Sequence, residues 1–227
     1  MDWKAFWNNR AEMFPERLAQ VGRGDGSGYA EEAERFEKTL NHIFSTLKVE
    51  EGMPVLDLCC GNGLISHALA EKGAEVLGID FAEKLLKIAK KKAPKNARFI
   101  QGDALDLEGV VEEKFDRILL HFSLQYFTKE KEVRTLFKSM ANLCSPGGMI
   151  LVSDIPDSAK VGAYYTTPKD KLRRMWHKFK GQDDMGKFWK RKQLVKICSE
   201  LGLSAEALDQ PETLPYAHYR FDLIIRP

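Results

Sequence analysis

Three aspartates recur at equal intervals of 23 residues and are the first candidates for binding chemistry: Asp57, Asp80 and Asp103. Each lies at or near the end of a short apolar run, VLDL at 55–58, EVLGID at 75–80 and FIQGDA at 99–104. Such carboxylates can accept hydrogen bonds from ribose hydroxyls or an exocyclic amine, and an anion favours an ammonium or a sulfonium over a pyrophosphate. The row therefore suits a nucleoside that carries an amino-acid arm and no phosphates.

A glycine-containing turn, CCGNG at 59–63, follows the first aspartate. Gly61 and Gly63 have no Cβ, so a ligand can approach the backbone closely, and the helix that follows offers free N–H groups to it. The dinucleotide fingerprint G-x-G-x-x-G requires a third glycine at position 66, where Ser66 stands. The break in this motif counts against a nicotinamide or flavin dinucleotide.

Alternating strands and helices are expected to hold these residues at one edge of a sheet. Apolar runs predict strands at 54–59, 75–79, 98–101, 115–121 and 149–154, and helical periodicity predicts helices at 64–72, 82–93 and 131–143. Strands separated by helices imply a doubly wound α/β sheet of mostly parallel strands, whose ligands lie at the carboxyl ends. The tail predicts a helix at 190–201 and then strands at 204–208 and 219–226. These two strands have no helix between them, so they pair as antiparallel neighbours.

At residues 36–155 and in the final strand pair, the chain resembles the class I S-adenosylmethionine-dependent methyltransferases. VLDLCCGNG resembles the first family motif, EVLGID the second, FIQGDALDL the third, FDRILLHFSLQYF the fourth and LCSPGGMILVSD the fifth. The resemblance implies a Rossmann-like, seven-stranded sheet with a reversed last strand. It also implies S-adenosylmethionine as cofactor and S-adenosylhomocysteine as product.

The resemblance assigns roles to residues at the strand ends. Asp57 and the turn with Cys59, Gly61, Asn62 and Gly63 would hold the methionyl arm, and Cys59 stands where many members have glycine. Asp80 would take the ribose hydroxyls and Asp103 the adenine amine. The remaining cofactor contacts would be Phe81, Gly102, Ala104, His121, Phe122 and Ser123.

The acceptor side has two weaker candidates. His121 and Asp154 stand where the fourth and fifth strands end, and either could remove a proton from the methyl acceptor. Their alternatives are a satisfied core histidine and a turn cap within DIPD. An N-P-P-Y-like tetrapeptide is absent after the fourth strand, where His-Phe-Ser-Leu stands. This counts against amino methylation of exposed bases or glutamine amides and favours a small-molecule acceptor at oxygen, nitrogen or carbon.

We expect one methyltransferase domain over residues 1–227. It would comprise a helical N-terminal cap at 1–50, a cofactor-binding core at 51–155, a substrate lid at 156–189 and a C-terminal helix and strand hairpin at 190–227. The lid carries bases and aromatic residues that suit an anionic or aromatic substrate, or single-stranded RNA: Lys171, Arg173, Arg174, Trp176, Lys178, Phe179, Phe188 and Trp189. In the cap, Arg10, Arg23 and Tyr29 are expected to touch the methionyl carboxylate.

Composition narrows the remaining possibilities. The chain is 44% apolar and 30% charged with a net charge of +2, a globular mix with no apolar run long enough to span a membrane, and we expect no secretory signal. The four cysteines form no C-x-x-C pair, so we expect reduced thiols in a cytoplasmic protein and no metal site. The alternatives to a small-molecule methyltransferase are an RNA methyltransferase that uses the basic lid and a non-catalytic module that binds the cofactor for a partner. The sequence does not indicate an oligomeric state.

Overall fold

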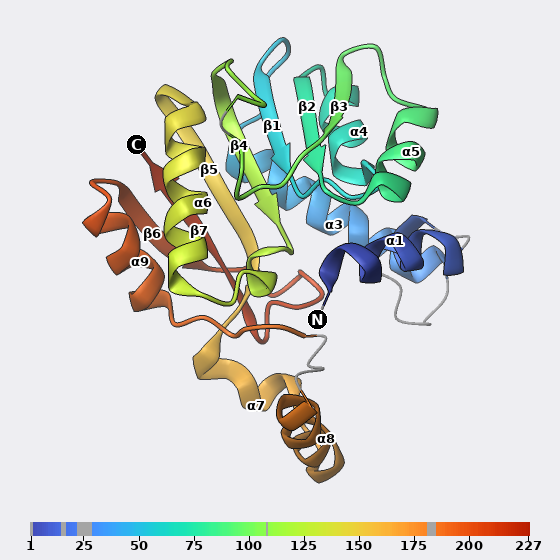
Figure 1. The fold of residues 1–227 in the computed structure, drawn as a ribbon, viewed down its shortest axis with the longest axis vertical. Helices are drawn as coiled ribbons and strands as arrows, with labels where there is room; N and C mark the ends of the chain where they lie inside the picture. The colour runs from blue at the N-terminus through green and yellow to red at the C-terminus, as the bar shows by residue number, and fades with distance from the viewer. Residues whose placement is uncertain (1, 15–16, 22–28, 108, 181–184) are drawn as a thin grey trace.

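A seven-stranded sheet in the order β3-β2-β1-β4-β5-β7-β6 forms the centre of the molecule (Figure 1). The structure is a computed structural model that describes residues 2–14, 17–21, 29–107, 109–180 and 185–227. The parallel strands are β1 (Pro54–Leu58), β2 (Glu75–Asp80), β3 (Ala97–Gln101), β4 (Phe115–His121) and β5 (Cys144–Pro156). β7 (Arg220–Arg226) runs antiparallel to both β5 and β6 (Ser204–Asp209). The prediction of a doubly wound sheet with a reversed last strand is confirmed.

Helices cover both faces of this sheet because each inner strand is apolar on both sides. On one face α6 (Glu130–Leu143) and α9 (Arg191–Glu200) pack against Leu56, Ile118 and Val152. On the other face α3 (Tyr29–Leu47) and α4 (Leu64–Glu71) pack against Val55 and Leu119. The alternation along β1 therefore turns Leu56 toward α6 and Val55 toward α4, as expected for a pleated strand.

The remaining helices lie at the carboxyl end of the sheet or beside it. α5 (Glu83–Lys91) follows β2. α1 (Trp3–Met13) lies beside the start of α5, where Asn8 Oδ1 accepts a hydrogen bond from Lys84 N at 3.0 Å. α2 (Arg17–Gln20) contacts the turn after β1. α7 (Val161–Tyr164) and α8 (Pro168–Lys180) project below the sheet in Figure 1, and short 3₁₀ turns occupy Leu124–Tyr126 (η1) and Ser158–Lys160 (η2). Among the described residues, no helix is both long and apolar enough to cross a membrane.

The fifth strand is longer than the expected range of 149–154. β5 begins at Cys144, which pairs with Phe115, and it continues to Pro156, which pairs with Arg220. A register shift separates the pairs of Phe115 and Arg117, so the Ser-Pro-Gly-Gly segment is an irregular beginning of the strand and not a loop before it. At the other end, Asp154 lies within a second register shift with β7, between the pairs of Val152 and Ile155, and the strand continues past it through Ile155 and Pro156.

Candidate active site

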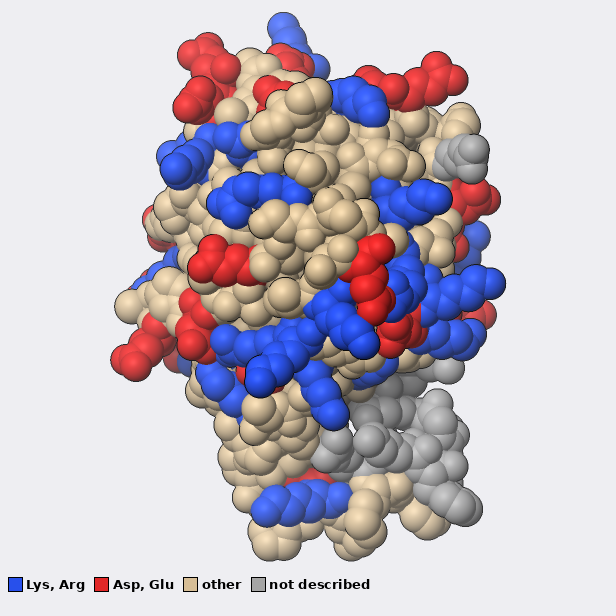
Figure 2. Space-filling model, turned by 90° about the vertical axis from the view of Figure 1, so that its left-hand side faces the viewer, with Lys and Arg blue, Asp and Glu red and all other residues tan. Residues whose placement is uncertain are grey.

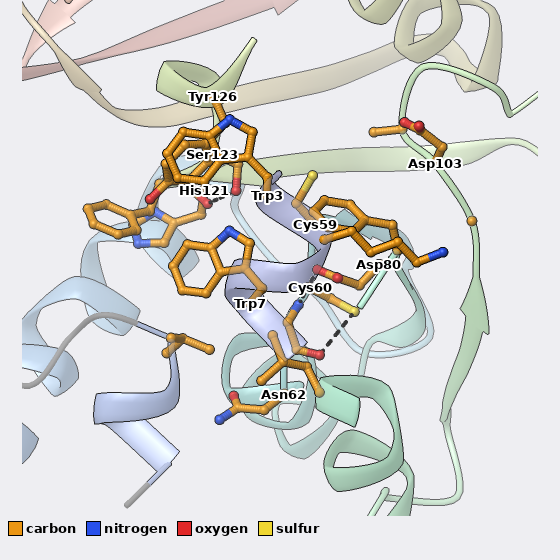
Figure 3. A pocket seen from close by; sticks show the side chains of 18 of the residues that line it. Trp3, Trp7, Cys59, Cys60, Asn62, Asp80, Asp103, His121, Ser123 and Tyr126 are labelled. Carbon is orange, nitrogen blue, oxygen red and sulfur yellow. Dashed lines mark hydrogen bonds between the residues drawn. The ribbon is translucent and has the colours of Figure 1, made fainter. Parts of the chain in front are cut away.

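A cavity of about 530 Å³ opens at the carboxyl ends of β1, β2, β3 and β4, within the usual size range of small-ligand sites. It gathers nearly all of the predicted cofactor residues, as Figure 3 shows for those that it labels. The predicted residues that line it are Cys59, Gly61, Asn62, Asp80, Phe81, Gly102, Asp103, Ala104, His121, Phe122 and Ser123. Asp57 and Gly63 do not line it.

The turn after β1 has the backbone conformation that its glycines predict. Gly61 and Gly63 have φ of +57° and +73°, the left-handed region that glycine tolerates best. A Cβ on Gly63 would lie 2.9 Å from Ala89 Cβ, so this glycine also lets the turn pack against α5. Cys59 adopts φ +59° without being glycine, which places backbone strain at the mouth of the cavity.

Asp80 is held by the backbone and still faces the cavity. Its Oδ2 accepts from Gly61 N at 2.8 Å and its Oδ1 accepts from Ala82 N at 2.7 Å. Burial raises the pKa of this carboxyl, while the two backbone donors act in the opposite direction. Each carboxylate oxygen can accept a further hydrogen bond, so Asp80 can receive two hydroxyl donors from a ligand in the cavity.

Asp57 lies in β1 with its side chain 2% exposed. Its Oδ2 accepts from Ser66 Oγ at 2.5 Å, so the residue that breaks the dinucleotide fingerprint partners the buried carboxyl. The pKa of Asp57 is raised to about 7, mainly by burial and also by nearby Asp80, while the Ser66 hydrogen bond acts in the opposite direction. A role for Asp57 at the methionyl arm stays a prediction.

Replacing Asp57 by Asn should change how stability depends on pH. A carboxyl whose pKa is raised on folding stabilises the native state below its unfolded pKa near 4, and this stabilisation is lost as pH rises through about 7. Relative to wild type, Asp57→Asn should therefore gain about 2 to 3 kcal/mol of unfolding free energy between pH 5 and pH 8. Urea unfolding at both pH values measures this gain. Asp103→Asn, at an exposed position, is the control, and identical pH curves for Asp57→Asn and wild type would contradict the prediction.

The third aspartate, Asp103, lies exposed at the rim of the cavity. Its Oδ1 accepts from Leu105 N at 2.9 Å, which fixes the turn after β3. Gly102 approaches Ile79 closely, since a Cβ on Gly102 would lie 3.2 Å from Ile79 Cγ2. The segment thus brings its backbone, together with one carboxylate, against the cavity.

At the end of β4, His121 enters the cavity with a fixed ring. Its Nδ1 lies 2.6 Å from Ser153 Oγ, and Ser123 Oγ donates to its carbonyl oxygen at 2.9 Å. The next residue, Phe122, has φ +56° and lines the cavity. Asp154, the second candidate base, does not line this cavity, although its Oδ2 lies 4.0 Å from His121 Nε2. The geometry therefore favours His121 over Asp154 as the group that meets an acceptor.

The aromatic residues that α1 and η1 contribute to the cavity wall were not predicted. Trp3 and Trp7 on α1 approach Tyr126 of η1, with ring centroids 4.3 Å and 5.7 Å apart, and all three line the cavity (Figure 3). The spacing of four residues shows that the two tryptophans share one face of a helix, but it does not show that this face lines the cavity. The helix was expected over the cofactor, but no residue pattern showed which side chains would enter.

The other expected cap contacts have different outcomes. Arg10 does not line the cavity; its guanidinium lies over the Phe14 ring at 4.7 Å and donates to the carbonyl of Ala19. Arg23 lies outside the described residues, as does the side chain of Tyr29. Asn62 has a structural contact that was not expected, because its Nδ2 donates to the carbonyl of Arg17 at 2.8 Å and so ties α2 to the turn.

The described part of 156–189 does not line the cavity, so its role as a lid stays a prediction. Trp189 is fully buried and donates to the carbonyl of Leu124 at 3.3 Å, which makes it a core residue and not a pocket wall. Phe188 packs among Tyr164, Tyr165 and Tyr219. Trp176 is 58% exposed and Lys171 is exposed. The side chains of Arg173, Arg174, Lys178 and Phe179 lie outside the described residues.

Figure 2 shows a band of lysine and arginine side chains across the face that carries α9, above α7 and α8. Basic residues at the start of α9 and in η2 are paired with acids. Arg191 contacts Asp157 and Asp209 at 2.7 Å and 2.6 Å, and Lys160 contacts Asp209 at 3.2 Å. Paired surface charges of this kind are also expected on an ordinary solvated face. RNA binding by this region therefore stays a prediction.

Comparisons with known proteins agree with this geometry. Residues 55–148 match the family model described as a methyltransferase domain. The ubiquinone biosynthesis O-methyltransferase of Coxiella burnetii is 30% identical over 204 residues, which cover 89% of this chain and 76% of that protein. The chain belongs to the class I S-adenosylmethionine-dependent methyltransferases.

Other relatives of this chain match over shorter stretches. YqeM of Bacillus subtilis is 32% identical over 149 residues, 60% of each chain. The demethylmenaquinone methyltransferase of Staphylococcus epidermidis is 32% identical over 116 residues, 48% of this chain and 46% of that protein. The chain thus spans about half to two thirds of the length of several curated relatives that it matches.

Solved structures show the same fold. The magnesium protoporphyrin IX methyltransferase of Synechocystis with bound S-adenosylmethionine has a TM-score of 0.65 at 18% identity, with 99% of this chain and 97% of that chain covered. A DhpI complex with S-adenosylhomocysteine has a TM-score of 0.65 at 17% identity, with 99% and 94% covered. The cavity of this methyltransferase fits the family cofactor, because a backbone-held carboxylate and a glycine turn face the same space.

Proposed function

We propose that this protein transfers a methyl group from S-adenosylmethionine to a flat small molecule, aromatic or quinonoid. The observation that carries the proposal is the composition of one cavity. Asp80 lies at one side of it, Trp3 and Tyr126 form an aromatic wall, and His121 enters it from β4 (Figure 3). Relatives named for ubiquinone and demethylmenaquinone methylation support a ring-shaped acceptor.

The residues divide into those that hold the cofactor and those that meet the acceptor. Asp80 would accept from the ribose hydroxyls and Asp103 from the adenine amine. The turn Cys59–Gly63 and, indirectly, Asp57 would hold the methionyl arm. The ring of the acceptor would stack on the aromatic wall, since offset and edge-on ring pairs are favourable at about 4.5–7 Å. The aromatic wall would also attract a sulfonium cation.

When bound, S-adenosylmethionine supplies an electrophilic methyl group that needs no activation by the protein. The chain's own work is therefore to position the acceptor in line with that group and to keep water out. His121 would take the proton of the acceptor, because its ring enters the cavity while Ser153 fixes its orientation at 2.6 Å. We infer a cytoplasmic site of action, supported by four unpaired cysteines.

Thermal unfolding with parallel ligands tests the cofactor, and release of product tests the reaction. S-adenosylhomocysteine at about a hundred times its dissociation constant should add about 2.7 kcal/mol of stability, whereas NAD should add none. With S-adenosylmethionine, a panel of phenols and hydroquinones should contain acceptors that release S-adenosylhomocysteine in proportion to methylated product. Stabilisation without methyl transfer to any ring-shaped acceptor, with transfer to RNA instead, would overturn the proposal.

A further inference from the structure

A second, much smaller cavity adjoins His121. It measures about 10 Å³, room for about one water molecule. Among the described residues, His121 is the one that lines both this cavity and the large one. The other residues around it come from α3, β5 and the segment between β6 and β7: Thr39, His42, Ser153, Asp154, Gln210, Leu214, Pro215 and Tyr216.

Two buried carboxylates meet beside this cavity, and Asp154 is the one of the two that lines it. Asp154 and Asp222 are 3% and 2% exposed. Gln210 Nε2 donates to both, at 3.4 Å to Asp154 Oδ1 and 2.8 Å to Asp222 Oδ1, and Asp154 N donates to Asp222 Oδ1 at 2.8 Å. One buried cation, Arg220, contacts Asp154 with 3.7 Å between Nε and Oδ1. Two carboxylates beside one guanidinium leave one negative charge that nearby imidazoles can balance.

An imidazole lies at each end of this arrangement. His42, on α3, has its Nε2 2.6 Å from Asp222 Oδ2. Its side chain is 16% exposed, so it reaches the surface. His121 Nε2 is 4.0 Å from Asp154 Oδ2, and its ring also lines the large cavity. The buried carboxylates therefore lie between a histidine in the active site and a histidine that touches solvent.

The small cavity has a polar group suited to a bound water. Gln210 Oε1 is buried and, within the part of the chain that the structure describes, accepts no hydrogen bond. Buried acceptors are normally satisfied by protein or by ordered water. A water here would have Gln210 and the two imidazoles as neighbours, and it would connect His121 with His42.

We propose that His42 is a positioning residue for methyl transfer, acting on His121 through this buried network, and that the acceptor's proton leaves the active site along it. The inference rests on the proposed function. As the new bond from the acceptor atom to the methyl carbon forms, the sulfur–methyl bond breaks and its electron pair stays on sulfur. The acceptor's proton passes to the His121 ring, which lines both cavities and whose Nε2 lies beside Asp154, and then to His42 and solvent.

The network makes the two histidines competitors for one proton. The charged and titratable groups around them are Asp154 from β5, Asp222 and Arg220 from β7, Tyr216 from the segment before β7, and the two imidazoles from α3 and β4. Removing His42 takes away one of the two imidazoles beside this negative charge, so His121 should then keep its proton to a higher pH. Removing the charge of Asp154 or Asp222 should have the opposite effect.

Histidine-ring NMR of the full chain tests this coupling without an acceptor. The signals of His121 are identified by their absence in His121→Gln, and pH titrations are recorded with S-adenosylhomocysteine as the only added ligand and without it. The midpoint of the His121 titration should rise by about half a pH unit or more in His42→Gln and fall by about as much in Asp154→Asn. Asp222→Asn, a second variant of the pair, should also lower it. His218→Gln, the same change at an exposed histidine, should leave it unmoved.

The outcomes separate this inference from the proposed function. A His121 midpoint that moves no more in His42→Gln and Asp222→Asn than in His218→Gln overturns the network, whether or not the protein methylates anything. If S-adenosylhomocysteine leaves the histidine-ring signals unchanged while His42 and His121 are still coupled, the proposed function is overturned instead. Once an acceptor is found, the acid limb of the pH profile of kcat should move upward in His42→Gln. A lower kcat with an unmoved profile would mean that His42 is only structural, against the proposal.

Discussion

Replacing Asp80 by Asn should weaken binding of S-adenosylhomocysteine by about 30- to 150-fold, the effect of losing about 2 to 3 kcal/mol of hydrogen bonding to a charged acceptor. The carboxylate is 7% exposed and accepts from Gly61 N and Ala82 N, so its orientation toward the cavity is fixed before any ligand arrives. An amide of the same shape has one accepting oxygen, and its NH₂ would face a backbone donor. The substitution therefore affects both the ribose contact and the turn that carries Gly61.

Isothermal titration calorimetry with S-adenosylhomocysteine measures this effect, with circular dichroism to verify the fold. Asp103→Asn is the matched control, because it removes the same charge from the rim of the same cavity, where the side chain is exposed. It should weaken binding by less than about tenfold, since water competes for an exposed hydrogen bond. Equal losses in the two variants would show that Asp80 has no special part in binding.

The cofactor side of the site could be predicted from sequence because each residue is fixed by its own strand end. Asp80 follows an apolar run and precedes a helix, so a parallel sheet places it at the carboxyl edge whatever the distant chain does. The glycine turn was predictable in the same way, because it follows β1 directly and glycine permits the positive φ values found at Gly61 and Gly63. The antiparallel pairing of β7 with β6 was predictable for a similar reason, since the missing crossover helix between these strands is a local feature of the sequence.

Apart from His121, the acceptor side could not be predicted, because its residues meet through long-range packing. Trp3 and Tyr126 are more than a hundred residues apart in the sequence, and their rings meet only after α1 docks beside α5. Asp154 was expected at a strand end facing the substrate, but a register shift between Val152 and Ile155 accompanies φ +65° at Asp154 and a buried position beside β7. Local propensity contains no information about that shift, so the contacts of Asp154 with Arg220 and Asp222 could not be predicted from the sequence.

Arg220→Met should destabilise the protein by about 3 to 5 kcal/mol at neutral pH, because it leaves a buried carboxylate without its cation. Arg220 is 1% exposed, donates to the carbonyl of Asp154, and its guanidinium lies over the Phe122 ring at 4.5 Å. Methionine fills a similar volume and keeps the apolar contact, so the loss should come mainly from the charge. Chemical denaturation gives the free energy of unfolding directly.

Arg134→Met provides the contrast for this prediction. Arg134 contacts two carboxylates, Glu130 and Glu200, but its side chain is 34% exposed, and pairs of this kind contribute about 1 kcal/mol or less.

The second test is a double-mutant cycle with Asp154→Asn. If the cost of Arg220→Met is the stranded charge, then adding Asp154→Asn should recover at least half of it, because the remaining amide needs no counter-ion. Additive losses would instead mean that Arg220 stabilises the fold through its ring contacts, and that the charge balance between β5 and β7 contributes little to holding the end of β5 beside His121.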